Sequence, residues 1–132
     1  MPLIKHLQET EPFDQLPESA FKELKEAAVQ KKFPANFDIF KQNDPPTGYL
    51  YVINEGLVTI TLLSPGGIDM VVDYRKEGQL FGGTPVFTGE PYAGGARTVK
   101  ITVCYLIPAE VLQKLQVVFP QLSKFFTHSV LS

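Results

Sequence analysis

Residues Gly78 to Arg97 read GQLFGGTPVFTGEPYAGGAR and contain six of the ten glycines in the chain. The stretch lies between two segments whose apolar residues are typical of β-strands. Glycine allows positive φ angles and a close approach of the backbone to a ligand, and successive exposed amides can form a concave site for anionic oxygens. The stretch therefore predicts a ligand-binding loop. A long connection without a ligand is the alternative, since such loops also occur as plain connections.

The segment before this loop combines helical and strand patterns. A short helix is predicted over Leu3–Gln8 and a longer one over Pro17–Ala28, whose apolar residues share one face. From Val29 on, the period changes to that of strands. Further strands are expected over Tyr49 to Ile53, Val58 to Leu62 and Ile68 to Tyr74, with a hairpin turn at Ser64 to Gly67.

The segment after the loop predicts one further long strand and then helices. The strand is expected over Arg97–Leu106, and Pro108 and Pro120 are suited to the first positions of two helices. This order predicts a mainly β fold with flanking α-helices: a double-sheet antiparallel jelly roll, or β-roll, with N-terminal and C-terminal helices packed to one side. We expect a single domain over residues 1–132, with N-terminal helices in 1–28, the β-roll in 29–107 and C-terminal helices in 108–132.

Several segments resemble the cyclic-nucleotide-binding domain superfamily. The segments KEGQLFGG (76–83), TGEP (88–91) and CYLIPAEVLQKL (104–115) are similar to that family's phosphate-binding cassette and to the strand and helix that follow it. Residues 33–67, FPANFDIFKQNDPPTGYLYVINEGLVTITLLSPGG, resemble its early β-roll. The resemblance implies turns at Asn36 and Asn43, where the family often has glycine, and asparagine is the other residue that best tolerates left-handed backbone. The closest resemblance is to bacterial versions that precede CBS-domain pairs and a nucleotidyltransferase domain. The resemblance implies a regulatory domain excised from a longer protein.

Two ligand anchors of that family are replaced in this chain. The resemblance implies a glutamate after the FG pair, which accepts from the ribose hydroxyl, and an arginine after the loop proline, which holds the cyclic phosphate. Here Gly83 follows FG and Tyr92 follows Pro91. Neither residue can replace a carboxylate or a guanidinium, and losing such a charged contact costs on the order of 2 to 5 kcal/mol. We therefore expect weak or no binding of cyclic AMP and cyclic GMP, and a gain in affinity if Gly83→Glu and Tyr92→Arg are combined.

Two other features of the loop have alternative interpretations. Arg97 is the remaining cation near the loop, and we expect it to be a solvated strand arginine. Tyr92 is either a half-buried loop aromatic or a ring that stacks on a base or closes an altered pocket. Gly94 and Gly95 either supply backbone donors or are flexible filler. The candidate ligand contacts are Phe81, Gly82, Gly83, Thr84, Tyr92, Ala93, Gly94, Gly95, Ala96, Arg97 and the strand residue Val72.

Composition excludes several classes of function. The chain is 44% hydrophobic and 20% charged, with a formal net charge of −2, which gives no general attraction for nucleic acid. No stretch approaches the roughly 18 apolar residues of a membrane span, and the N-terminus lacks the apolar core of a secretory signal. We expect a cytoplasmic protein with neither nucleic acid nor membrane as a partner.

The sequence offers no catalytic or metal-binding constellation. His6 and His128 are the only histidines and lie in terminal segments, so a jelly-roll metal site of the cupin type is excluded. Asp69 and Asp73 are expected on one strand face, without accompanying ligands. The lone Cys104 excludes an internal disulfide and is expected to be buried. We predict no enzyme activity, no catalytic residue, no metal and no cofactor.

Two functions remain. The first is a sensor domain that binds a nucleotide-like small molecule of unidentified structure under the loop and passes its ligand state to an attached output domain. The second is a degenerate module that binds no nucleotide and serves in protein interaction or dimerisation. An apolar stripe at the C-terminus either folds back onto the roll or pairs with a second copy, and we expect a homodimer through this helix. The stripe consists of Leu122, Phe125, Phe126 and Val130.

Overall fold

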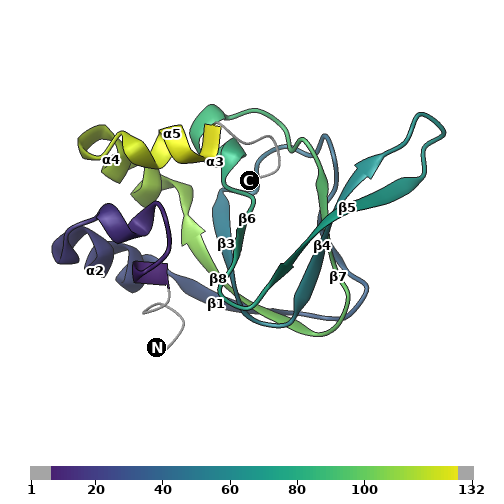
Figure 1. Ribbon diagram of the computed structural model, residues 1–132, viewed down its shortest axis with the longest axis horizontal. Coiled ribbons are helices and arrows are strands. Elements are labelled where there is room, and N and C mark those ends of the chain that lie inside the picture. Colours follow the sequence, from purple (N-terminus) through teal and green to yellow (C-terminus); the bar gives the residue numbers. More distant parts are fainter. Residues whose placement is uncertain (1–6, 128–132) are drawn as a thin grey trace.

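In the computed structural model, which describes residues 7–127, eight strands form two antiparallel sheets (Figure 1). The strands are β1 (Val29–Phe33), β2 (Asp38–Phe40), β3 (Tyr49–Glu55), β4 (Leu57–Leu63), β5 (Asp69–Lys76), β6 (Leu80–Phe81), β7 (Gly95–Thr98) and β8 (Thr102–Pro108). The first sheet has the order β1-β8-β3-β6 and the second the order β2-β7-β4-β5. The predicted double-sheet jelly roll is confirmed.

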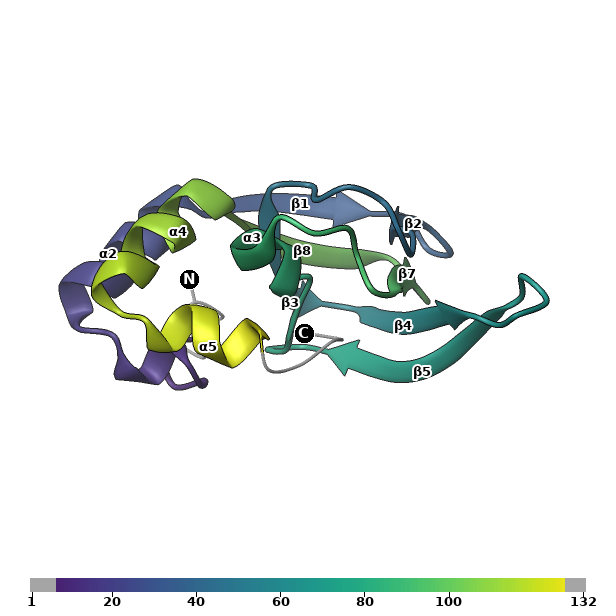
Figure 2. The same ribbon diagram turned by 90° about the horizontal axis from the view of Figure 1, so that it is seen from above.

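The helices gather at one end of the roll, and the β4–β5 hairpin extends at the other end (Figure 2). They are the 3₁₀ helix η1 (Phe13–Gln15) and the α-helices α2 (Glu18–Ala27), α3 (Thr84–Thr88), α4 (Ala109–Val118) and α5 (Gln121–Thr127). Pro108 precedes α4 as its N-cap and Pro120 precedes α5, so each proline lies one residue before its helix. None of the described helices is long and apolar enough to cross a membrane.

Two hydrophobic cores lie on opposite faces of the first sheet. Along β3, Leu50 and Val52 face a core shared with the helices, whereas Tyr51 and Ile53 face the interior of the roll. We call these the helix-side core and the roll core. The helix-side core includes Leu7, Phe13, Phe21, Leu24, Leu50, Val52, Ile107, Leu112, Leu122 and Phe126. The roll core includes Phe33, Phe40, Tyr51, Ile53, Val58, Ile60, Phe81, Tyr92, Cys104 and Leu106.

The apolar stripe at the C-terminus folds back onto its own domain. Leu122 and Phe126 are 0% and 1% exposed within the helix-side core, and Phe125 packs partly buried against it. Val130 lies outside the described residues. The described part of the stripe is therefore covered within the monomer.

The single long strand predicted over Arg97–Leu106 is wrong. The segment forms β7 and β8, which belong to different sheets. Val99 and Ile101, in the connection between them, are 43% and 56% exposed. An apolar run predicts extended backbone, but it does not show which sheet each half joins, because that choice depends on distant partners.

A β-bulge in β5 overturns a second expectation. Val71 pairs with Thr61 and Asp73 pairs with Ile60, so Val72 is an extra residue on its strand. Directly opposed residues share a face, and Ile60 faces the roll core. Asp69 and Asp73 therefore lie on opposite faces of the sheet, and Asp73 is on the inner one.

The predicted turns are confirmed. Asn36 and Asn43 have φ angles of 56° and 73°. Ser64 to Gly67 form the turn between β4 and β5, where the Ser64 N–H donates to the Ile68 carbonyl at 2.8 Å. Of the short helix expected over Leu3–Gln8, residues 7 and 8 are helical and the rest lies outside the described residues, as do His6 and His128.

The burial of Ile53 predicts a large loss of stability on truncation. Ile53 is 0% exposed in the roll core, so we expect Ile53→Ala to lower the free energy of unfolding by about 2 to 5 kcal/mol in urea titration. Ile68→Ala is the matched control, because Ile68 is 69% exposed and the same change there should stay within about 0.5 kcal/mol. Equal losses in the two variants would contradict the assignment of the core.

Candidate functional site

The glycine-rich loop consists of a short strand, a tight turn and one helical turn. After β6, Gly82 has a φ of 76°, a value that glycine adopts without strain. Gly83 then precedes α3, which has proline in its first turn. The helix ends at Thr88, and its C-cap Gly89 has a φ of 72° and donates its N–H to the Pro85 carbonyl at 2.9 Å. The proline and the glycines thus set both ends of this short helix.

A small cavity of about 230 Å³ lies beneath the loop. Its described lining residues include neither lysine nor arginine, and Glu90 is the one carboxylate among them. Of the candidate contacts, this cavity is lined by Gly82, Thr84, Tyr92, Ala93, Gly94 and Gly95. The other described residues of its wall are Phe40, Ile60, Pro85, Thr88, Glu90, Pro91 and Thr127. The cavity therefore offers backbone, hydroxyl and aromatic groups, without a cation for a phosphate.

Tyr92 is part of the roll core, so the expectation of a half-buried residue is wrong. Its side chain is 3% exposed, and its ring stacks on Phe40 with centroids 3.6 Å apart and planes 9° apart. The Tyr92 hydroxyl and Thr47 Oγ1 are hydrogen-bonded at 2.9 Å, and Thr47 Oγ1 is bonded to the Tyr51 hydroxyl at 2.8 Å. A buried aromatic ring with a neutral hydroxyl network thus stands where the family's arginine is expected.

Two buried groups of the roll core have strongly raised pKa values. Burial raises the pKa of Tyr51 from 10.0 to about 12, and the hydrogen bond from Thr47 offsets part of this effect. Burial also raises the pKa of the Cys104 thiol from 9.0 to about 12. Cys104 is fully buried, as expected, and a thiol in this environment is protonated and unreactive at neutral pH.

Gly83 is in close contact with Phe126 of α5. A Cβ atom at position 83 would lie 2.2 Å from Phe126 Cδ1 and 2.5 Å from Cε1. The place of the expected ribose-binding side chain is therefore filled by an aromatic ring. The expectation that Gly83→Glu would restore this anchor is not compatible with the described position of α5.

The remaining candidate contacts lie outside the small cavity. Phe81 and Ala96 are 0% and 1% exposed in the roll core. Val72 is 40% exposed at the bulge and lines neither cavity described here. Arg97 is paired with Asp38, with Nη1 3.1 Å from Oδ1 and a side chain that is 44% exposed. Arg97 is thus the solvated strand arginine that we expected.

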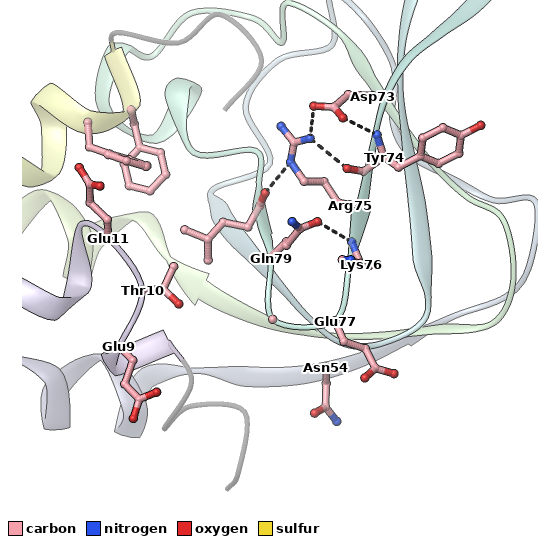
Figure 3. A pocket seen from close by; sticks show the side chains of 14 residues that line it. Glu9, Thr10, Glu11, Asn54, Asp73, Tyr74, Arg75, Lys76, Glu77 and Gln79 are labelled. Carbon is pink, nitrogen blue, oxygen red and sulfur yellow. Dashed lines mark hydrogen bonds and ion pairs between the residues drawn. The ribbon is translucent and has the colours of Figure 1, made fainter.

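A larger cavity of about 1010 Å³ opens between the N-terminal residues, β5 and α5 (Figure 3). Its described lining residues are Glu9, Thr10, Glu11, Asn54, Asp73, Tyr74, Arg75, Lys76, Glu77, Gly78, Gln79, Leu80, Phe125 and Phe126. In Figure 3, Glu9 and Glu11 come from the N-terminal side, opposite Arg75 and Lys76 on β5. The cavity therefore has charged groups of both signs.

Arg75 is a cation near the site that sequence reasoning missed. Its Nη1 donates to Asp73 Oδ2 at 2.5 Å and its Nε donates to the Leu80 carbonyl at 3.0 Å. The hydrogen bond from Arg75 lowers the pKa of Asp73. The bulge turns both side chains to the inner face of the sheet. The spacing of Asp73 and Arg75 in the sequence could have predicted their ion pair. It could not have predicted the bulge that turns both side chains to the inner face. Among residues 7–127, no group of three or more His, Cys, Asp or Glu side chains could hold a metal ion.

Comparison with known proteins identifies the fold and the family. A family model described as a cyclic nucleotide-binding domain matches residues 30–117. The regulatory domain of Toxoplasma gondii PKA with cAMP has a TM-score of 0.79 and 20% identity, with 85% of this chain and 42% of that chain covered. The sensor domain of the transcriptional regulator DNR from Pseudomonas aeruginosa has a TM-score of 0.75 and 23% identity, with 89% of this chain and 79% of that chain covered. The catabolite activator protein of Thermus thermophilus has a TM-score of 0.72 and 20% identity, with 85% of this chain and 52% of that chain covered.

The extent of these matches differs between the two chains of each pair. The chain spans about half the length or less of the first solved structures that it resembles, with 55%, 42%, 53% and 39% of those chains covered. At these identities the likeness concerns the fold. No curated protein matches the chain.

The raised pKa of Tyr51 predicts a loss of stability in alkali. Above pH 10 the tyrosine ionises in the unfolded chain, while in the folded protein it keeps its proton up to about pH 12. The unfolded state then binds fewer protons, so the free energy of unfolding falls by up to about 1.4 kcal/mol per pH unit between pH 10 and 12. Below pH 10 this contribution is fully present.

Urea unfolding followed by circular dichroism at several pH values checks this expectation. In Tyr51→Phe the group is absent, so the decline between pH 10 and 12 should be shallower than in the wild type. The buried Cys104 adds a decline of its own from about pH 9 in both proteins. Identical slopes in the two proteins would show that Tyr51 does not titrate as its burial implies.

Proposed function

Because this chain belongs to the cyclic nucleotide-binding domain family, we propose that it is a non-catalytic regulatory module that passes the ligand state of its loop to an attached domain. The observation that carries the proposal is the direct contact between the loop and the C-terminal helices. Thr84 Oγ1 donates to the Phe126 carbonyl at 2.7 Å, and Gln113 Nε2 donates to the Val86 carbonyl at 2.8 Å. A ligand that shifts α3 would therefore shift α4 and α5.

The cassette of this module is of a non-typical kind. Gly83 and Tyr92 stand at the positions of the family's two anchors, and the small cavity has neither lysine nor arginine among its described lining residues. A ligand in this cavity would contact the backbone of Gly82, Gly94 and Gly95, the Thr84 hydroxyl and the aromatic wall. These groups favour a molecule that is not held through a negatively charged phosphate.

The attached domain is proposed from the resemblance described above. In the bacterial versions whose TGEP and CYLIPAE segments are similar, a CBS-domain pair and a nucleotidyltransferase domain follow the module. We propose the same kind of output domain here, in a cytoplasmic protein of which residues 1–132 form one domain. The module itself would use no metal or cofactor and would bind neither nucleic acid nor membrane.

A degenerate interaction module is the second candidate function, and one observation favours it. The β4–β5 hairpin exposes apolar side chains at the end of the molecule opposite to the helices (Figure 1). They are Leu63, Ile68, Met70, Val71, Val72 and Tyr74, with exposed fractions between 40% and 69%. Exposed apolar groups in such a cluster are typical of a protein-binding surface.

Calorimetric titration with cyclic AMP and cyclic GMP tests the non-typical cassette. We expect no sub-micromolar binding, because that affinity needs about 8 kcal/mol and both charged anchors are absent. The Toxoplasma regulatory domain, whose structure contains cAMP, is the positive control. Sub-micromolar binding by the wild type would contradict the expectation, and Arg75→Gln and Arg97→Gln would then show which cation had replaced the anchor.

A thermal-shift screen with uncharged nucleosides and nucleobases, together with adenosine phosphates and dinucleotides, separates the two candidate functions. A ligand at 100 times its dissociation constant adds about 2.7 kcal/mol to the stability of the domain. A reproducible stabilising ligand supports the sensor. The absence of any supports the interaction module.

The proposal also includes a homodimer through the C-terminal helices. Leu122 and Phe126 face their own domain, but Val117 and Val118 at the end of α4 are 74% and 70% exposed. We expect light scattering across a concentration series to show a dimer that Val117→Ser with Val118→Ser converts to a monomer. Val29→Ser is the matched control, since Val29 is a 56% exposed valine in β1. A wild type that stays monomeric at the highest concentration contradicts the dimer.

A further inference from the structure

The contact between Gly83 and Phe126 lies between the two cavities. Gly82 and Thr84, the neighbours of Gly83, line the small cavity together with Thr127. Phe126 lines the larger cavity. The end of α5 thus separates two spaces that both border the loop.

Phe126 is held at this place by its ring and by its backbone. The ring is 1% exposed and stacks on Phe87 of α3, with centroids 5.4 Å apart and planes 17° apart. The ring centroids of Phe13 and Phe125 lie 6.3 Å and 5.1 Å from the centroid of the Phe126 ring. The Phe126 carbonyl accepts the hydrogen bond of Thr84 Oγ1 at 2.7 Å. The Phe126 ring therefore has aromatic rings at its sides and the Gly83 backbone at its base. We call the space enclosed by these groups the seat of Phe126.

The helix that carries Phe126 is a short and separate unit. α5 has seven residues and follows a break at Phe119, whose φ of −122° and ψ of 77° are not helical. A helix of this length is unstable alone, so its position depends on the burial of side chains such as Leu122 and Phe126. Rotation at the break can move α5 without unfolding the sheets.

We propose that Phe126 is an internal occupant of the ligand site: its ring fills the place beside Gly83 where the expected anchor side chain would meet a ligand, and departure of α5 joins the two cavities into one open site. This inference rests on the proposed function only in identifying the loop as a ligand site. A ligand that displaces the ring has a planar, largely apolar group, because Phe13, Phe87 and the backbone of Gly83 form the walls of the seat. Its polar part then extends toward the larger cavity, where the charged side chains lie.

The substitution Gly83→Ala tests the seat directly. The residue has a φ of −82° and a ψ of −35°, which alanine adopts without strain. The three heavy atoms nearest to the added methyl group all belong to the Phe126 ring, so the substitution acts first on that ring. We expect hydrogen exchange of the α5 amides to become faster by about tenfold or more, while β3 and β8 keep their protection. Gly66→Ala is the matched control, because the nearest atom to its added methyl group is Ser64 Oγ at 3.8 Å.

Two outcomes of this exchange experiment would overturn the proposal. If Gly83→Ala lowers protection in all elements equally, Phe126 is an ordinary core residue of one cooperative unit. If α5 keeps its protection, the ring is not seated against Gly83. Neither outcome depends on nucleotide titration, so failure of this inference is distinguishable from failure of the proposed function.

Indole serves as a planar apolar probe for the vacated seat. In Phe126→Ala, indole at millimolar concentration should raise the melting temperature, whereas the wild type should show no rise because its own ring fills the place. If Phe126→Ala does not fold, Phe126→Leu takes its place in the same comparison. An equal rise in the wild type, or none in the folded variant, contradicts a replaceable occupant.

Discussion

The burial of β3 and β8 on both faces organises the rest of the molecule. Side chains that alternate along β3 enter the roll core and the helix-side core in turn, and β8 does the same through Leu106 and Ile107. One sheet therefore joins two hydrophobic layers, and neither layer can shift without affecting the packing of the other. The loop and the C-terminal helices both attach to this sheet, which brings the candidate site close to the end of the described chain.

Aromatic contacts within the protein hold the loop in place. The Tyr92 ring stacks on Phe40, and the Phe126 ring covers Gly83. Gly83 and Tyr92 are the two positions at which the resemblance implies charged contacts with a ligand. Aromatic packing in a buried place stabilises the folded state without any ligand. These contacts hold the loop without a ligand, and neither lysine nor arginine is among the described residues that line the small cavity.

Local sequence patterns predicted where turns and strands lie, but not which sheet a strand joins or which face a side chain occupies. The turns at Asn36 and Asn43, the hairpin at Ser64 and the roll followed from backbone preferences and alternation, which act over a few residues. The change of sheet between β7 and β8 and the bulge at Val72 both depend on pairing with residues distant in the sequence. Local sequence patterns therefore predicted neither. The site shows the same division. The residues at the two expected anchor positions, Gly83 and Tyr92, could be read from the sequence. The ring that lies against Gly83 comes from Phe126, 43 positions away, and no local pattern predicts this contact.

The bulge in β5 has a consequence for the behaviour of the protein at high concentration. β5 is the edge strand of the second sheet and has apolar side chains at Met70, Val71 and Val72. A straight apolar edge would be a template for strands of other molecules. The extra residue at Val72 reverses which side chains face inward halfway along the strand, so an added strand cannot keep one register over its whole length. The irregularity that turns Arg75 inward also protects the open edge from aggregation.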